Sequence, residues 1–205
     1  MSTKLHIERY CHIKNSTVSL NGAPLFEIAS EDFLTFIKAA YKELDTKYSK
    51  FFKMDNLSKL AFLAADVLLK EDTSLSEGEK NIAIVLSNRA SSLDTDRKHQ
   101  ASISDPKNYY PSPAVFVYTL PNICIGEISI KHKLFSENSF FIFETFSADL
   151  LKVYTESLLK TNKAEKVLCG WVDFDADSYE AFLYLVSSEG TIEHNNNEIT
   201  RLYRL

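Results

Sequence analysis

The sequence predicts an α/β protein with a mixed, mostly parallel five-stranded sheet and helices on both of its faces. Continuous apolar runs rich in β-branched and aromatic residues are typical of strands buried on both faces. Amphipathic runs of helical period separate most of them. The last two apolar runs, Val167–Val172 and Ala181–Ser188, are joined by too few residues for a parallel crossover. The last core strand is therefore expected to run antiparallel to its neighbour.

The composition indicates one globular domain over residues 1–205. Hydrophobic residues make up 45%, which argues against disorder. The net charge of −5 carries no basic stripe, which argues against a nucleic-acid partner. No apolar run is long enough to span a membrane, and the start resembles no signal peptide, so we expect a cytoplasmic protein. Cys11, Cys124 and Cys169 have no metal-site spacing. We therefore expect reduced core thiols, no metal and no cofactor.

The first half of the chain reads as a strand, a hairpin, two helices and a central strand. Residues 4–14 form the first strand, and Asn21-Gly22 marks a hairpin turn. Ser30 is expected to cap the first helix, and a second helix covers about residues 57–70 with one apolar face. A polar loop over residues 71–80 then leads to the buried parallel strand at 81–88.

The middle of the chain is less regular. Residues 89–111 are expected to form a solvated loop, in which Asp96 and His99 are too common a pair to indicate acid–base chemistry. Ser112-Pro113 indicates the start of a short helix, and residues 122–133 fit another. At the other end of the chain, residues 192–205 are expected to add a last pair of edge strands.

A strand–helix–strand unit organises the chain. The run Ser139–Phe146 is expected to be a strand, Ser147 caps a helix that ends near Thr161, and Val167–Val172 is the next strand. Glu144, Thr145 and Phe146 would then lie at the positive end of the helix, where nucleophiles and anions are favoured. None of these three side chains is a convincing catalyst.

Several motifs occur in the order seen in one known family. They are Met54-Asp55 with Ala64-Ala65, the strand 81–87, Pro111-Ser112-Pro113 through Gly126-Glu127, Glu137-Asn138, and Cys169-Gly170-Trp171. In this order and spacing the chain resembles the N-terminal half of β-ketoacyl-(acyl carrier protein) synthases of the thiolase superfamily. The resemblance covers roughly residues 52–188. It implies a half-thiolase fold.

The resemblance also implies a lost active site. The family's nucleophile is a Cys at the start of the helix after the strand, and counting back from Gly170 places that position at Thr145. The family's catalytic His pair lies in a C-terminal half that follows the matched region. A Thr hydroxyl lacks the activation of a thiolate. We therefore expect no catalytic residue, although an enzyme that uses Glu144 or Thr145 is a third alternative.

Two functions remain open. The first is a non-catalytic accessory subunit of fatty-acid, polyketide or polyene lipid synthesis, partnered by an active ketosynthase and an acyl carrier protein. The second is a binding or scaffold protein that reuses the half fold. On the expected helix, Asp149, Lys152, Glu156 and Lys160 form a polar stripe. Burying them under a second half would be costly, so we expect no such half to cover it.

The resemblance finally implies an assembly. In the family, the strand that leads to the nucleophile lies at the sheet edge and pairs with its twin. Here that strand carries Phe140, Phe141 and Phe143 and no Lys or Pro. An exposed apolar edge invites pairing. We therefore expect a homodimer through these residues, with a heterodimer with an active synthase as the alternative.

Overall fold

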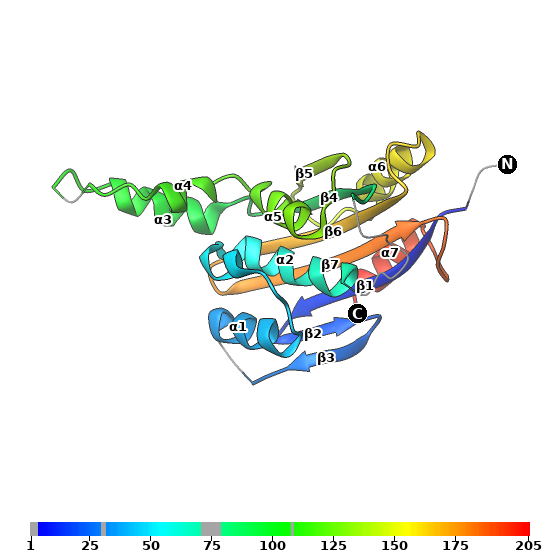
Figure 1. The fold of residues 1–205 in the computed structure, drawn as a ribbon, viewed down its shortest axis with the longest axis horizontal. Helices are drawn as coiled ribbons and strands as arrows, with labels where there is room; N and C mark the ends of the chain where they lie inside the picture. Colours follow the sequence, from blue (N-terminus) through cyan, green and yellow to red (C-terminus); the bar gives the residue numbers. More distant parts are fainter. Residues whose placement is uncertain (1–3, 30–31, 71–78, 108) are drawn as a thin grey trace.

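One continuous sheet organises the computed structural model, which describes residues 4–29, 32–70, 79–107 and 109–205. Seven strands follow the order β3-β2-β1-β7-β6-β4-β5, and β8 pairs with β1 (Figure 1). The strands are β1 (His6–Lys14), β2 (Thr17–Leu20), β3 (Ala23–Glu27), β4 (Ile82–Asn88), β5 (Asn138–Ile142), β6 (Lys166–Asp175), β7 (Ser178–Ser187) and β8 (Ile192–Glu193). All five core strands expected from the sequence belong to this one sheet, which confirms the α/β class.

The sheet is mixed, as expected. Strand β4 runs parallel to β5 and to β6, and β7 runs antiparallel to β6, which confirms the direction of the last core strand. Strand β1 is also antiparallel to β7. Two of the four pairs among the core strands are therefore parallel, a smaller share than the sequence suggested. The hairpin β2–β3 extends the sheet beyond β1.

The hairpin turn forms where Asn21-Gly22 predicts it. Both residues have positive φ, 51° for Asn21 and 83° for Gly22, as a type I′ turn requires. The Asn21 side chain also accepts a hydrogen bond from the Tyr10 backbone N–H at 2.9 Å. This contact ties the turn to β1.

Helices cover both faces of the sheet. One face carries α1 (Phe33–Glu43), the 3₁₀ turn η1 (Ser49–Lys53), α2 (Asn56–Leu69) and α5 (Ile123–His132), and the other carries α6 (Ala148–Lys160) and α7 (Asn196–Tyr203). Every residue of α2 from Leu57 onward is buried, where the sequence suggested a single buried face. The reason is that α2 contacts the sheet on one side and α1 and α5 on others.

Of two helix caps expected from the sequence, one lies outside the described residues and the other is confirmed. The N-cap of α1 is Asp32, whose carboxylate accepts from the Thr35 backbone N–H at 2.8 Å; Ser30, the expected cap, lies outside the described residues. Ser147 caps α6 as predicted, because its hydroxyl accepts from the Leu150 N–H at 3.4 Å. Most of the polar loop expected at 71–80 also falls outside the described residues.

The expectation of a last pair of edge strands is wrong. Strand β8 is only two residues long, and the chain then forms helix α7. Asn195 caps this helix by accepting from the Glu198 N–H at 2.9 Å. Ile199 and Leu202, three residues apart, are both buried against the sheet. The capping side chain and the helical spacing outweigh the tendency of this segment to extend.

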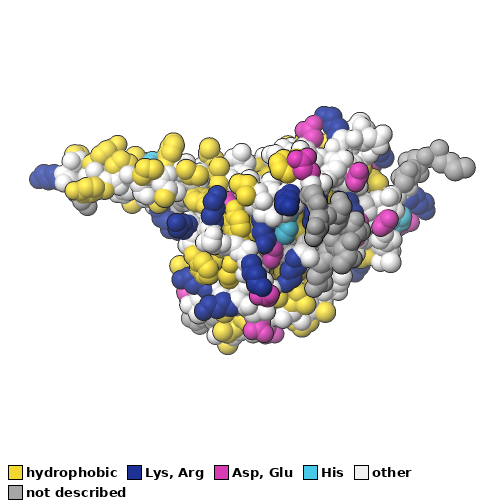
Figure 2. All heavy atoms as spheres, viewed as in Figure 1, with side chains coloured by type: hydrophobic (Ala, Val, Ile, Leu, Met, Phe, Trp, Pro, Cys, Tyr) yellow, Lys and Arg dark blue, Asp and Glu magenta, His cyan; other side chains and the backbone are white. Residues whose placement is uncertain are grey.

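The expectation of a solvated loop at 89–111 is also wrong, because the middle of this segment forms a helix. Helices α3 (Leu93–Ile103) and α4 (Pro113–Val117) form an arm, residues 93–107 and 109–120, that projects from the body (Figure 1). Asp94 and Asp96 occupy the first turn of α3, where the helix dipole favours them. Figure 2 shows hydrophobic side chains gathered along this arm.

The two edges of the sheet differ. The edge strand β3 contains Pro24 and ends at Glu27, features that discourage pairing with another chain. The opposite edge strand β5 reads NSFFI, without charge or proline. The expected strand Ser139–Phe146 is thus shorter than predicted, but its edge position is confirmed.

Candidate functional site

Thr145 and Glu144 lie in a pocket at the end of the parallel strands. The pocket has a volume of about 240 Å³ and is lined by Arg89, Glu144, Thr145, Phe146, Trp171, Asp173, Ser178, Glu180 and Tyr203. Arg89 directly follows β4, and Glu144 and Thr145 lie between β5 and α6. Ligand sites in open α/β sheets form at this carboxyl end of the strands. The pocket is therefore the candidate site.

The site presents little that could activate Thr145. Thr145 and Glu144 are both exposed. No His and no Cys line the pocket within the described residues. The start of α6 offers its positive end, and Ser147 already accepts one of the free N–H groups there. This arrangement can hold a polar group, and the lining carries three carboxylates, Glu144, Asp173 and Glu180, but no thiol or imidazole.

Aromatic rings form one wall of the pocket. Phe146 stacks on Tyr203 from α7 with 4.0 Å between ring centroids, and it meets Trp171 edge-on at 6.3 Å. The Trp171 side chain is buried. The sequence did not indicate Tyr203 as a site residue, because its segment was expected to be a strand. The wall gives the pocket an apolar side.

The charged groups at the rim are largely engaged with one another. Asp173 Oδ1 accepts from the backbone N–H groups of Arg89 at 3.1 Å and Ala90 at 2.9 Å. The Arg89 guanidinium lies 3.8 Å from Asp173 Oδ2. The Tyr203 hydroxyl donates to Glu180 Oε2 at 2.8 Å. Burial, and then this bond to Glu180, raise the pKa of Tyr203 well above its usual value, so the phenol stays protonated.

The three thiols of the chain are buried and lie outside this pocket. Cys11, Cys124 and Cys169 are free and buried, as expected. Burial raises the pKa of the Cys169 thiol to about 11, and it raises the pKa of the other two further. Cys169 accepts from the Thr155 hydroxyl and donates to the Tyr184 hydroxyl, both at 3.3 Å. A protonated, enclosed thiol is a poor nucleophile.

The position of Thr145 was counted from Gly170, and the structure requires a glycine at residue 170. Its φ of 153° lies in a region that favours glycine, and a Cβ atom there would lie 2.0 Å from the Phe182 carbonyl oxygen. Strands β6 and β7 therefore approach each other closely at this point. Ser87 on β4 donates to the Gly170 carbonyl at 3.0 Å from the other side.

The phenylalanines of the expected interface already pack within the chain. Phe140 packs against the core under α2 and α5, and Phe141 packs against the core under α6. Phe141 stacks on Phe143 at 5.7 Å and meets Tyr154 at 5.1 Å. All three rings are half-buried. A dimer through β5 would thus use its backbone edge and the neighbouring exposed residues more than these rings.

The polar stripe on α6 lies at the surface and touches α7 at one end. Asn196 of α7 donates to Asp149 Oδ1 at 2.9 Å. Glu156 pairs with Lys152 at 2.8 Å and with Lys160 at 2.5 Å, and its side chain is only 19% exposed. Asp149 and Lys160 are exposed, and Lys152 and Glu156 are half-buried, so the stripe stays at the surface, as the sequence suggested. Pairing with the two lysines keeps the cost of the partial burial of Glu156 low.

The Asp96–His99 pair is not brought together. Asp96 accepts from the Ser92 hydroxyl at 3.2 Å, whereas the His99 ring packs against Phe116 at 5.3 Å. In the described part of the chain, no group of three or more His, Cys, Asp or Glu side chains is placed to hold a metal ion. No helix there is long and apolar enough to cross a membrane.

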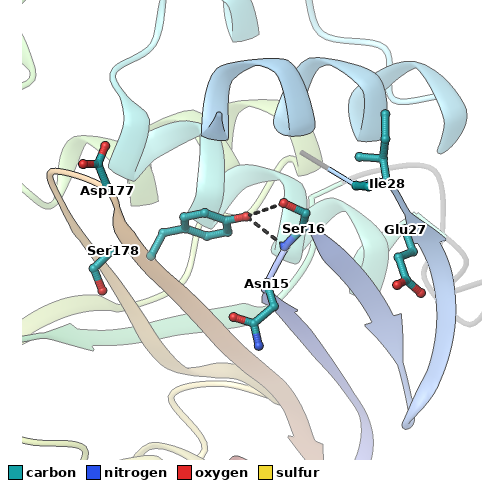
Figure 3. A pocket seen from close by; sticks show the side chains of 8 residues that line it. Asn15, Ser16, Glu27, Ile28, Asp177 and Ser178 are labelled. Atoms are coloured by element: carbon teal, nitrogen blue, oxygen red, sulfur yellow. Dashed lines mark hydrogen bonds between the residues drawn. The ribbon is translucent and has the colours of Figure 1, made fainter. Parts of the chain in front are cut away.

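A second, wider pocket lies beside the turns at one end of the sheet. It has a volume of about 700 Å³ and is lined by Asn15, Ser16, Glu27, Ile28, Ala29, Asp177, Ser178 and Tyr179 (Figure 3). The Tyr179 hydroxyl accepts from the Ser16 backbone N–H at 2.9 Å and lies 3.2 Å from the Ser16 hydroxyl. These bonds join the β1–β2 turn to β7. The lining offers polar groups but no nucleophile with a base.

Solved ketosynthase structures share the fold. No family model matches the sequence, and no curated protein matches it. The ishigamide ketosynthase/chain length factor superposes with a TM-score of 0.65 at 17% identity, over 90% of this chain and 62% of that one. A ketosynthase in complex with its chain length factor from Xenorhabdus doucetiae superposes with a TM-score of 0.58 at 15% identity, over 98% of this chain and 90% of that one. A β-ketoacyl synthase from Burkholderia phymatum STM815 superposes with a TM-score of 0.59 at 11% identity, over 98% of this chain and 61% of that one.

These likenesses confirm a thiolase-like, ketosynthase fold. The chain spans less than two thirds of the length of the first and the third of these proteins. The region that it matches contains the strand–helix unit in which Thr145 lies.

Proposed function

We propose that this chain is a non-catalytic, ketosynthase-like accessory protein in the synthesis of fatty-acid, polyketide or polyene acyl chains. One observation carries the proposal: in a ketosynthase fold, Thr145 stands at the entry to α6 in a pocket that contains neither thiol nor histidine. Condensation of the family's kind needs a thiolate and an acid–base pair. The described residues around Thr145 supply no thiol and no histidine pair.

The same pocket is still suited to contact with an acyl-chain partner. Its aromatic wall of Phe146, Trp171 and Tyr203 is apolar, and the N–H groups at the start of α6 can donate hydrogen bonds to a polar group. The similar solved structures include a ketosynthase bound to its chain length factor and a type II PKS acyl-carrier protein in complex with its ketosynthase. We therefore propose a ketosynthase-fold subunit and an acyl carrier protein as partners of this chain.

Mass spectrometry tests the catalytic part. Purified protein is incubated with acyl- and malonyl-carrier thioesters, with Thr145→Ala as the matched control. We expect no condensation product and no acyl adduct on either protein. A stable adduct on Thr145 that disappears in Thr145→Ala would refute the proposal.

A pulldown tests the accessory role. The tagged protein is used to capture acyl carrier proteins and ketosynthases from its own cells. Enrichment of either class over a tag-only control supports a role in acyl-chain synthesis. Enrichment of neither class favours the alternative, a binding or scaffold protein that reuses the fold.

A further inference from the structure

We propose that a third pocket, on the face of β1, β2 and β3 next to the end of α7, binds a small monocarboxylate. Lys14 is its counter-ion, and His12 and Ser19 are its hydrogen-bonding groups. The inference goes beyond the proposed function, because this pocket shares no lining residue with the pocket of Thr145. It holds whether or not the chain serves acyl-chain synthesis.

The pocket has the size of a small-ligand site. Its volume is about 320 Å³, at the lower end of the range for such sites. Five polar side chains line it: His12, Lys14, Asn15, Thr17 and Ser19. They come from two neighbouring strands, β1 and β2, and from the turn between them. The hairpin therefore supplies all the polar side chains of this site.

Strand register places these side chains on one face of the sheet. His12 lies opposite Ser19, and Lys14 lies opposite Thr17. His12 and Lys14 are two residues apart on one strand, so both point to the same face. Ile13 between them points to the other face and belongs to the core under α1 and α2. The same strand thus builds apolar core on one side and a polar floor on the other.

The helices on this face leave the floor open. The apolar cluster under α6 and α7 draws described residues from β1, β4, β6 and β7, but none from β2 or β3. Leu205, just after α7, is 58% exposed and forms one side of the pocket, and Pro24 of β3 forms another. Apolar sides next to a polar floor suit a ligand with one charged end and a short hydrocarbon end.

His12 is the one buried residue among the described residues that line the pocket. It is 4% exposed, and its ring stacks on Phe182 with 4.8 Å between ring centroids. The carbonyl groups of Leu202 and Tyr203 lie near the ring, but the enclosed Nε2 atom has hydrogen-bond geometry with no described residue. A bound polar group would stabilise such a side chain, since an unpaired buried nitrogen is costly.

The donors at the rim are available to a ligand. Lys14 lies within ion-pair distance of no carboxylate in the described parts of the chain. The Ser19 hydroxyl and the Asn15 side-chain amide likewise have no hydrogen-bond partner among the described residues. The described lining contains no Asp and no Glu. The pocket therefore presents one positive charge together with neutral donors.

This balance of charge favours a carboxylate over a phosphate. Burial, and then the charge of Lys14, lower the pKa of His12 to about 4, so near neutral pH the imidazole offers a hydrogen bond and no charge. A carboxylate carries one negative charge, which Lys14 alone can neutralise. A phosphate monoester carries about −1.5 to −2. The carbonyls at the negative end of α7 oppose that excess charge.

A titration of the full-length protein followed by NMR tests the site. Butyrate is the probe, and the ring C–H resonances of His12 report binding in this pocket. We expect saturation with a dissociation constant on the order of 1 mM, the affinity that one charge-assisted contact and a few hydrogen bonds supply. Butyramide has nearly the same shape without the charge and should bind at least about 10-fold more weakly. Inorganic phosphate should also bind more weakly than butyrate.

Matched variants separate the pocket from general charge effects. Lys14→Gln should raise the butyrate dissociation constant at least about 10-fold, and Ser19→Ala should raise it about 3-fold. Lys42→Gln is the control, because Lys42 is exposed on α1, which covers the opposite face of the sheet. Circular dichroism checks that each variant is folded.

Three results would overturn the proposal. No saturation up to about 20 mM butyrate, or equal affinities of the wild type and Lys14→Gln, would remove the site. Tighter binding of phosphate than of butyrate would remove the carboxylate as its ligand. None of these outcomes alters the thioester result on which the proposed function depends.

Discussion

Two buried histidines should make the fold sensitive to mild acid. His12 and His194 are 4% and 5% exposed, and burial lowers the pKa of each from 6.5 to about 4. Lys14 adds to the lowering at His12, and Glu156 partly opposes it at His194. Between pH 6.5 and 4 the unfolded chain therefore binds more protons than the folded one. Stability is present above pH 6.5 and is lost as the pH falls towards 4.

The magnitude follows from the two pKa values. Lowering the pKa from 6.5 to about 4 is worth on the order of 3 kcal/mol for each histidine, so both together could remove on the order of 6 kcal/mol. The total stability of a domain is about 5–15 kcal/mol. Near pH 5 the free energy of unfolding should fall by roughly 2–3 kcal/mol for each pH unit of acidification.

Other titrating groups act mainly outside this window. Pairing lowers the pKa of Glu156, and hydrogen bonds from Thr46 and His132 lower that of Asp66 despite burial. The stability that these two carboxylates contribute is lost only when the pH falls below their ordinary pKa values, 4.5 for Glu156 and 3.8 for Asp66. Asp55, whose pKa burial raises, acts in the opposite direction. The loss between pH 6.5 and 4.5 should therefore come mainly from the histidines.

Urea unfolding measured at several pH values checks this. The single Trp171 is buried and reports unfolding by its fluorescence. His12→Gln and His194→Gln should each remove about half of the slope between pH 6.5 and 4.5, and the double variant should remove most of it. A wild-type stability that stays flat across this range, or a slope that the double variant retains, would refute the reasoning.

Three further outcomes are expected. Gly170→Ala should destabilise the fold by more than about 3 kcal/mol in urea unfolding, because the new Cβ atom would clash with the Phe182 carbonyl oxygen. Gly126→Ala is the control, since no atom lies within 4 Å of a Cβ atom at that position. Thr145→Cys should yield no condensation product from acyl- and malonyl-carrier thioesters, since the pocket offers the new thiol no histidine. The three thiols should react with a thiol reagent only after denaturant is added, and fast labelling of the native protein would contradict their burial.

The sequence predicts this fold well where local and long-range preferences agree. Asn21-Gly22 forms its turn because both residues accept positive φ, and the buried strands β4, β6 and β7 carry continuous apolar runs. It fails at α3 because that helix has no apolar stripe and is held by single polar contacts such as Thr95 with Asp55. Such contacts between distant residues leave no periodic signal in a sequence.

Local signals in the sequence predict only part of the candidate site. Glu144 and Thr145 could be located because the strand before them and the cap at Ser147 are local signals. Arg89 and Asp173 were missed, although Arg89 follows β4 and Asp173 lies in β6 just beyond its last pair with β4, the position that could have identified them. Tyr203 could not be found, since it reaches Phe146 only after α7 folds back across the sheet.

The pairing of β1 with β7 has a consequence for synthesis of the chain. His6 lies opposite Ser187, which closes a loop of about 180 residues. The first strand therefore leaves the ribosome long before its central neighbour exists, with only the β2–β3 hairpin on its other side. Topologies dominated by such distant contacts fold slowly. During that interval the inner edge of β1 is open to wrong strands, so we expect the nascent protein to depend on chaperones more than its modest size suggests.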